Sequence, residues 1–148
     1  MSFQTDLAAL FQRDLDKVIA EIRGFSQEAD LWRAAPGMIN PAGNLVLHLE
    51  GNLREYVGRQ LGGVAYQRQR PLEFSNTGVS AAELIARIEA VRELVPPIAG
   101  TLSEEALEAR YPEDVMGGPM VTRWFLIHLH GHLMFHLGQI NATRRVLA

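Results

Sequence analysis

Apolar residues recur at steps of three and four along four separate stretches of the chain. In the first stretch, Leu7, Phe11 and Leu15 share one face of an amphipathic helix. The same period predicts four helices, at residues 2–25, 42–61, 80–97 and 122–146, and a shorter helical turn at residues 103–109. No stretch alternates between apolar and polar residues for long enough to predict a strand. The pattern therefore favours an all-α four-helix bundle that forms a single domain over residues 1–148.

The connection between the second and third predicted helices is unusually long. Residues 62–79 lack a clear apolar period and are predicted to form a crossover. The third helix is expected to begin at Ser80, because Glu83 follows at the spacing of a capping box. We expect it to end at Pro96 and Pro97, since proline interrupts helical hydrogen bonding.

The last predicted helix is apolar on all sides. Such a helix is buried on more than one side, which indicates either a central position in the bundle or an additional interface such as a homodimer contact.

Composition excludes several classes of protein. The 148 residues are 47% hydrophobic and 21% charged with a net charge of −3, and nothing in them predicts a nucleic-acid surface. The absence of cysteine excludes disulfides, a cysteine nucleophile and thiolate metal sites, and it favours a cytoplasmic location. No secretory leader pattern and no membrane-length apolar run are found in the sequence.

Four of the five histidines fall within nine residues of the last predicted helix. Three of them, His128, His132 and His136, are spaced i, i+4 and i+8, and each step of four rotates only ~40° around a helix, so they project from nearly one face. The pair His132 and His136 has a spacing that allows two imidazoles to bind one metal ion. His130 lies ~200° from His132 and is expected at the surface or at a subunit interface.

The remaining histidine lies in a polar strip on the second predicted helix. Asn44, His48 and Asn52 are spaced i, i+4 and i+8 among leucines, and a polar strip that faces a core needs partners. If this strip faces the last helix, three imidazoles, those of His48, His132 and His136, surround one point. Three protein ligands with one open position are typical of a catalytic zinc-type site. A satisfied polar seam without metal is the alternative.

Three stretches of the sequence resemble motifs of a known family. HGHLMFHLGQIN, at residues 130–141, is similar to the H-x-x-x-H-x-G-Q-I signature of the DinB-like superfamily. NLVLHLEGNLR, at residues 44–54, resembles the helix that carries that superfamily's first histidine, and YQRQRPLEF, at residues 66–74, resembles an arginine-rich crossover of some branches.

The resemblance implies a fold, a metal site and a cofactor class. It implies a bundle of up-down-down-up order in which His48, His132 and His136 hold one divalent metal ion. We place zinc first, with nickel, iron or manganese as alternatives, because three imidazoles do not choose among such metals. It further implies a homodimer, and a transferase or isomerase that uses a low-molecular-weight thiol such as bacillithiol or mycothiol.

Our leading hypothesis from the sequence is a metal-dependent thiol S-transferase that acts on a small-molecule substrate. A bound divalent cation deprotonates a coordinating thiol, and the cofactor must bring the sulfur because the chain has no cysteine. Arg68, Arg70 and Arg123 are candidates to bind carboxylates of that cofactor. Glu73 is a candidate catalytic proton acceptor.

Three further polar residues are candidates to support the metal ligands. Asn52, His128 and Gln139 could orient the ligands or contact substrate.

Two other functions stay open. One is metal-assisted hydrolysis, for which Glu73 would be the general base. The other is a non-catalytic dimeric interaction module stapled by the metal, in which His128 would be a fourth ligand.

Overall fold

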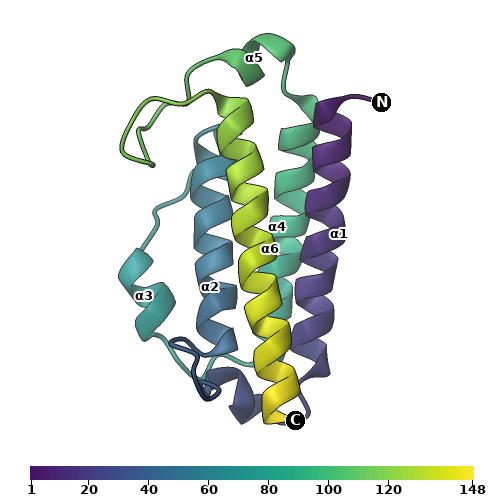
Figure 1. The fold of residues 1–148 in the computed structure, drawn as a ribbon, viewed down its shortest axis with the longest axis vertical. Helices are drawn as coiled ribbons and strands as arrows, with labels where there is room; N and C mark the ends of the chain where they lie inside the picture. The colour runs from purple at the N-terminus through teal and green to yellow at the C-terminus, as the bar shows by residue number, and fades with distance from the viewer.

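Four long helices lie side by side in the computed structural model, which describes residues 1–148 (Figure 1). They are α1 (Phe3–Gly24), α2 (Ala42–Leu53), α4 (Ala81–Thr101) and α6 (Thr122–Leu147). The shorter elements are η1 (Glu28–Trp32), η2 (Arg54–Arg59), α3 (Arg70–Ser75) and α5 (Glu104–Glu108). No strand forms, and a single isolated bridge joins Arg110 to Val121. The all-α fold expected from the sequence is therefore confirmed.

The direction of each long helix can be followed in Figure 1. Helices α1 and α6 run from the upper end of the bundle to the lower end, whereas α2 and α4 run from the lower end to the upper. Helix α1 packs on α4 and α6, and α2 packs on the same two helices. Helices α6 and α4 therefore occupy opposite corners of the bundle, and α6 has neighbours only on its two inner sides.

Serine caps fix the starts of three helices. The hydroxyls of Ser2, Ser80 and Ser103 accept hydrogen bonds from backbone N–H groups three residues further on, at 3.2, 3.1 and 3.0 Å. A serine at this position satisfies an N–H group that has no partner within the helix. The predicted start of α4 at Ser80 is confirmed.

The predicted end of α4 at Pro96 and Pro97 is wrong, because the helix continues to Thr101. Each proline removes one helical hydrogen bond. Val95 and Ala99 on the same stretch are fully buried, so their packing in the core outweighs that loss.

The second predicted helix changes its geometry near its end. Regular α-helix stops at Leu53, and η2 continues as a π-helix. Its wider turns are seen in the hydrogen bonds from Gln60 N–H to Glu55 O at 3.1 Å and from Gly62 N–H to Val57 O at 3.0 Å. Single π-helical turns often occur at functional sites.

The crossover contains a helix that the apolar period did not predict. Helix α3 is only six residues long, too short for a helical period to be recognised. The Asn44 side chain on α2 donates to the backbone oxygens of Glu73 at 3.1 Å and Asn76 at 2.8 Å. These bonds fasten α3 against α2 and hold Glu73 at a fixed height along the bundle.

The core of the bundle is made of leucine, valine, isoleucine and phenylalanine side chains from all four long helices. None of these helices is both long enough and apolar enough to cross a lipid bilayer.

Candidate metal centre

Helices α2 and α6 bring three histidines to one point. His48 on α2 places its Nε2 atom 3.1 Å from Nε2 of His132 on α6, and Nε2 of His136 lies 3.1 Å from the same His132 atom. One potential ligand atom from each residue lies within 4.8 Å of the others. Neighbouring ligand atoms around a tetrahedral metal at about 2.1 Å are roughly 3.4 Å apart, so this spacing fits one ion.

Hydrogen bonds to oxygen atoms outside the cluster fix the orientation of two of the three imidazoles. His48 Nδ1 lies 2.9 Å from Glu73 Oε1, and His136 Nδ1 lies 2.7 Å from Gln139 Oε1. An acceptor oxygen at Nδ1 places the proton on that nitrogen, which leaves the Nε2 lone pair pointing inward. Metal-binding histidines in proteins are commonly oriented by such an outer acceptor.

The three imidazoles have too few N–H groups to hydrogen-bond with one another. With Nδ1 protonated on His48 and on His136, both Nε2 atoms present lone pairs to Nε2 of His132. One N–H of His132 can donate to only one of them, and its own Nδ1 is buried without a partner. A cation between the three lone pairs would satisfy all of them. The donor set therefore suits a divalent metal.

The electrostatic surroundings keep His132 and His136 uncharged. Burial, together with the nearby His136, His48, His128 and Arg68, lowers the pKa of His132 to about 3. Burial also lowers the pKa of His136, although its bond to Gln139 acts in the opposite direction. Neutral imidazole is the form that binds metal, so these ligands need lose no proton near neutral pH.

Glu73 reaches His48 from helix α3. Burial alone would raise the pKa of its carboxyl, but hydrogen bonds from His48 and Arg68 and the charge of Arg68 hold that pKa below its usual range. Arg68 donates to both oxygens, with Nε 2.8 Å from Oε2 and Nη2 2.9 Å from Oε1. Gly51 makes this approach possible, because a Cβ atom there would lie 1.9 Å from Glu73 Oε2. No sequence pattern singles out Gly51.

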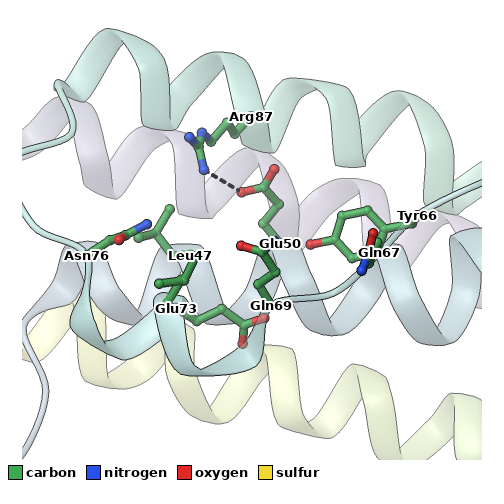
Figure 2. Close-up of a pocket in the computed structure, with 9 residues that line it drawn as sticks. Leu47, Glu50, Tyr66, Gln67, Gln69, Glu73, Asn76 and Arg87 are labelled. Carbon is green, nitrogen blue, oxygen red and sulfur yellow. Dashed lines mark hydrogen bonds and ion pairs between the residues drawn. The ribbon is translucent and has the colours of Figure 1, made fainter.

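Figure 2 shows the polar hollow on the other side of Glu73. The hollow has a volume of about 260 Å³ and lies between α2, α4 and the crossover. Its charged groups already pair with each other, since Arg87 Nη1 lies 3.4 Å from Glu50 Oε2. It contains no histidine, although His48 reaches the carboxylate of Glu73, which lines it.

A second cavity, of about 240 Å³, opens directly beside the histidines. Polar side chains in its wall include Asn52, Arg68, Arg70 and His128, with Val115, Met116 and Phe125 supplying apolar surface. Asn52 is buried, and its Oδ1 atom has no hydrogen-bond partner. The histidine cluster therefore faces a space large enough for a small molecule, with cationic and amide groups around it.

Comparison with known proteins gives the family. The model of the DinB superfamily matches residues 6–140. The chain belongs to the DinB superfamily. A DinB-like protein of Bacillus subtilis, at 19% identity, matches with a TM-score of 0.68 over 95% of this chain and 90% of its own. A DinB-like protein of Bacillus cereus, at 17% identity, matches with a TM-score of 0.65 over 89% and 84%. These two likenesses establish the DinB-like fold. A search of curated proteins found no match.

The other residues predicted for a site in this DinB-superfamily chain do not all lie near the histidines. Arg68 and Arg70 line the cavity, but Arg123 does not. Its guanidinium bonds Glu108 at 2.6 Å and Glu104 at 2.9 Å, at the start of α6. Nine helical residues, or ~13 Å, separate it from His132.

The two remaining histidines of α6 contact different neighbours. His128 lies in the cavity wall and stacks on Trp124, with ring centroids 5.7 Å apart, and it does not belong to the ligand cluster. His130 was expected at the surface or at a subunit interface. It instead faces α1, where its Nε2 lies 2.8 Å from the fully buried carboxylate of Asp14. No sequence pattern predicts this pairing, because Asp14 is 116 residues away.

Changing Glu73 to glutamine is expected to weaken zinc binding by about 10–100-fold, the usual effect of removing an outer acceptor. Glutamine keeps one acceptor oxygen but puts an NH2 donor where Oε2 accepts from Arg68 Nε, and it removes the negative charge beside His48. Competition with a chromophoric chelator would measure the affinity. Glu50→Gln is the matched control, since Glu50 pairs with arginines on the other side of α2. Equal affinities of Glu73→Gln and wild type would contradict this role.

Proposed function

We propose that this chain binds one divalent metal ion through His48, His132 and His136 and uses it in a transferase reaction with a low-molecular-weight thiol. Zinc is the metal that we place first, with nickel, iron or manganese as alternatives. The observation that carries the proposal is the convergence of three imidazoles, two of which, those of His48 and His132, line an open cavity. Three protein ligands leave a coordination position for substrate.

The chemistry of the cavity supports a thiol as the fourth ligand. A divalent cation, when bound, favours the thiolate form of a coordinating thiol. Three neutral histidines leave the charge of such a cation uncancelled, so the site attracts an anion. The chain has no cysteine, which means that the sulfur belongs to a second molecule.

Arg70 is suited to binding an acidic group of that molecule. Its side chain is exposed at the cavity, it makes no ion pair with a carboxylate, and its guanidinium lies 5.4 Å from the centroid of the Phe74 ring. Arg68 is less available, because Glu73 occupies its guanidinium. We therefore assign carboxylate binding to Arg70 and the positioning of Glu73 to Arg68.

The state of Glu73 favours thiol transfer over hydrolysis. A hydrolase would need a general base to activate water. Both oxygens of Glu73 are already hydrogen-bonded, and its low pKa makes it a weak base. A non-catalytic interaction module stapled by the metal would need a fourth protein ligand, and His128 lies outside the ligand cluster. A thiol S-transferase fits the site best.

Metal analysis and a conjugation assay test the proposal together. Mass spectrometry of untagged protein is expected to find about one equivalent of a divalent metal. The metal-loaded protein is then expected to conjugate an apolar electrophile only when a low-molecular-weight thiol is added, and a chelator should abolish the reaction. Turnover of an ester or amide without thiol would contradict transfer and support hydrolysis. A wild-type protein that takes up no zinc, nickel, iron or manganese would contradict the metal site itself.

A further inference from the structure

The polar strip of α2 continues beyond the end of the regular helix. Asn44, His48 and Asn52 follow one another at steps of four, and Tyr56 is the next position of the same series. Asn44 fastens α3, whereas the other three side chains all line the cavity beside the histidines. Tyr56 therefore brings a phenol hydroxyl to the same wall that carries a metal ligand.

The π-helix η2 keeps Tyr56 on this face. Four residues exceed one turn of an α-helix by ~40°, so a regular helix would turn Tyr56 ~80° away from His48. The hydrogen bonds of a π-helix join residues five apart, so four residues fall short of one turn instead of exceeding it. Because Tyr56 lies within η2, this shortfall offsets the drift, and its side chain faces the cavity.

The hydroxyl of Tyr111 stabilises the π-turn at this residue. In a regular α-helix the backbone oxygen of Tyr56 would accept from the N–H of Gln60. Here Gln60 N–H donates instead to Glu55 O, at 3.1 Å. The Tyr111 hydroxyl donates to the Tyr56 oxygen at 2.7 Å. Burial raises the pKa of Tyr111, so this hydroxyl keeps its proton and remains a donor. A core side chain from outside the helix thus holds the π-turn.

The side chain of Tyr56 is fixed at its ring and free at its hydroxyl. The ring meets Phe125 edge to face, with centroids 5.3 Å apart, and the guanidinium carbon of Arg68 lies 5.6 Å from the ring centroid. Tyr56 bonds Tyr111 through its backbone oxygen, and its hydroxyl makes no hydrogen bond within the chain. A fixed ring that ends in an unpaired hydroxyl at a cavity wall is suited to binding a polar atom of a ligand.

We propose that the hydroxyl of Tyr56 donates a hydrogen bond to a carbonyl oxygen of the molecule that receives the thiol, and that Tyr111 is the positioning residue for Tyr56. This inference rests on the proposed function and deepens it, because it makes the acceptor substrate a carbonyl compound. The polar groups of the cavity then divide by chemistry. Arg70 is matched to a carboxylate, whereas an uncharged phenol is matched to an uncharged oxygen. The cation of Arg68 beside the ring favours an electron-rich partner for the hydroxyl.

The position of Tyr56 is tied to the histidine cluster. Arg68 contacts the Tyr56 ring and donates to both oxygens of Glu73. Glu73 in turn lies 2.9 Å from Nδ1 of His48. Side chains of a helix lean towards its N-terminus, so the Tyr56 ring leans back along α2 towards Asn52 and His48. A molecule that contacts both the histidines and the phenol would therefore lie along α2 within the cavity.

Two aryl probes that differ in one oxygen test the hydroxyl. Acetophenone carries a carbonyl oxygen, whereas ethylbenzene has the same carbon skeleton without it. Tyr56→Phe is expected to weaken the binding of acetophenone about 3–10-fold, the usual effect of losing one uncharged hydrogen bond, and to leave the binding of ethylbenzene unchanged. Tyr66→Phe is the matched control, because Tyr66 lines the separate polar hollow (Figure 2), and it should bind both probes as the wild type does.

Fluorine NMR on the full chain measures binding and also reports on the ring. The chain has three tyrosines, so protein labelled with 3-fluorotyrosine gives three resonances, which the phenylalanine variants assign. Acetophenone is expected to shift the Tyr56 resonance. Tyr111→Phe keeps a ring in the core but removes the donor to Tyr56 O, so it should move that resonance without ligand and weaken the binding of acetophenone but not of ethylbenzene. A merely structural role of Tyr111 would lower stability without this selectivity.

The outcomes separate this inference from the proposed function. A wild type that does not bind acetophenone, or that binds it no more tightly than folded Tyr56→Phe does, would overturn the inference whatever the thiol assay shows. Selective loss of acetophenone binding in a chain that conjugates no thiol would contradict the transferase and support Tyr56 as a carbonyl-binding residue. Circular dichroism and zinc content, measured on every variant, check that the fold and the histidine cluster are intact.

Discussion

His132→Ala is expected to hold no metal, whereas the wild type holds about one equivalent. The Nε2 atom of His132 is the one that lies 3.1 Å from both other ligands, so its removal leaves two nitrogens and no central donor. Two imidazoles seldom suffice for a stable site. Thermal unfolding gives a second measurement. Zinc at 100 times its Kd stabilises a binding protein by about 2.7 kcal/mol. That free energy raises the Tm of a domain of this size by roughly 5–10 °C.

The quantity to compare between the variants is the change in Tm on adding zinc, not the Tm of each protein without zinc. His132→Ala is expected to show no shift, even if the substitution itself changes stability. His128→Ala is the matched control on the same helix, since His128 lines the cavity outside the ligand cluster, and it should keep both the metal and the shift. Metal retained at one equivalent by His132→Ala, or lost from His128→Ala, would contradict the assignment of ligands.

Asp14→Ala is expected to lower the free energy of unfolding by about 1–3 kcal/mol at pH 7, the usual effect of leaving a buried hydrogen-bonding group without its partner. Asp14 is fully buried between α1 and α6, and it accepts from Arg13 at 2.8 Å, His130 at 2.8 Å and Lys17 at 3.3 Å. Alanine leaves these donors without their shared acceptor. Urea unfolding followed by circular dichroism would measure the loss, with Asp16→Ala as the control at an exposed ion pair.

The effect of Asp14 is also expected to depend on pH. Burial alone would raise its pKa, but the bonds from Arg13, His130 and Lys17 outweigh burial and hold the pKa below its usual value. The stabilisation is therefore complete above about pH 4, the unfolded value, and is lost as pH falls towards the folded pKa. Wild type and Asp14→Ala should thus converge in stability below about pH 4. A difference that stays constant from pH 7 to pH 3 would show that the carboxylate charge contributes little.

The sequence predicted the long helices because each buries several turns of one apolar face. Leu7, Phe11 and Leu15 are all buried, as the period of α1 required. Local rules failed where tertiary packing dominates. Proline normally ends a helix, yet the core contacts of Val95 and Ala99 carry α4 through two of them.

The candidate ligands could be found for a similar reason. The spacing of His132 and His136 on one helix face is visible in the sequence, and His48 stands out in an apolar stretch. The groups that orient them are not visible in this way. Glu73 reaches His48 only because a six-residue helix in the crossover is fastened to α2, and Gly51 leaves room for it. Such contacts depend on the fold rather than on spacing along the chain.

The diagonal placement of α1 and α2 has a consequence for how the chain folds. Helices α1 and α2, which are neighbours in the sequence, do not pack extensively on each other, and the main partner of α1 is α4, which begins at Ala81. The apolar face of α1 is thus covered only after the chain has passed through α2 and the crossover. High contact order of this kind slows folding relative to bundles whose successive helices pair as hairpins. This chain is therefore expected to fold more slowly than a simple up-and-down bundle of the same length.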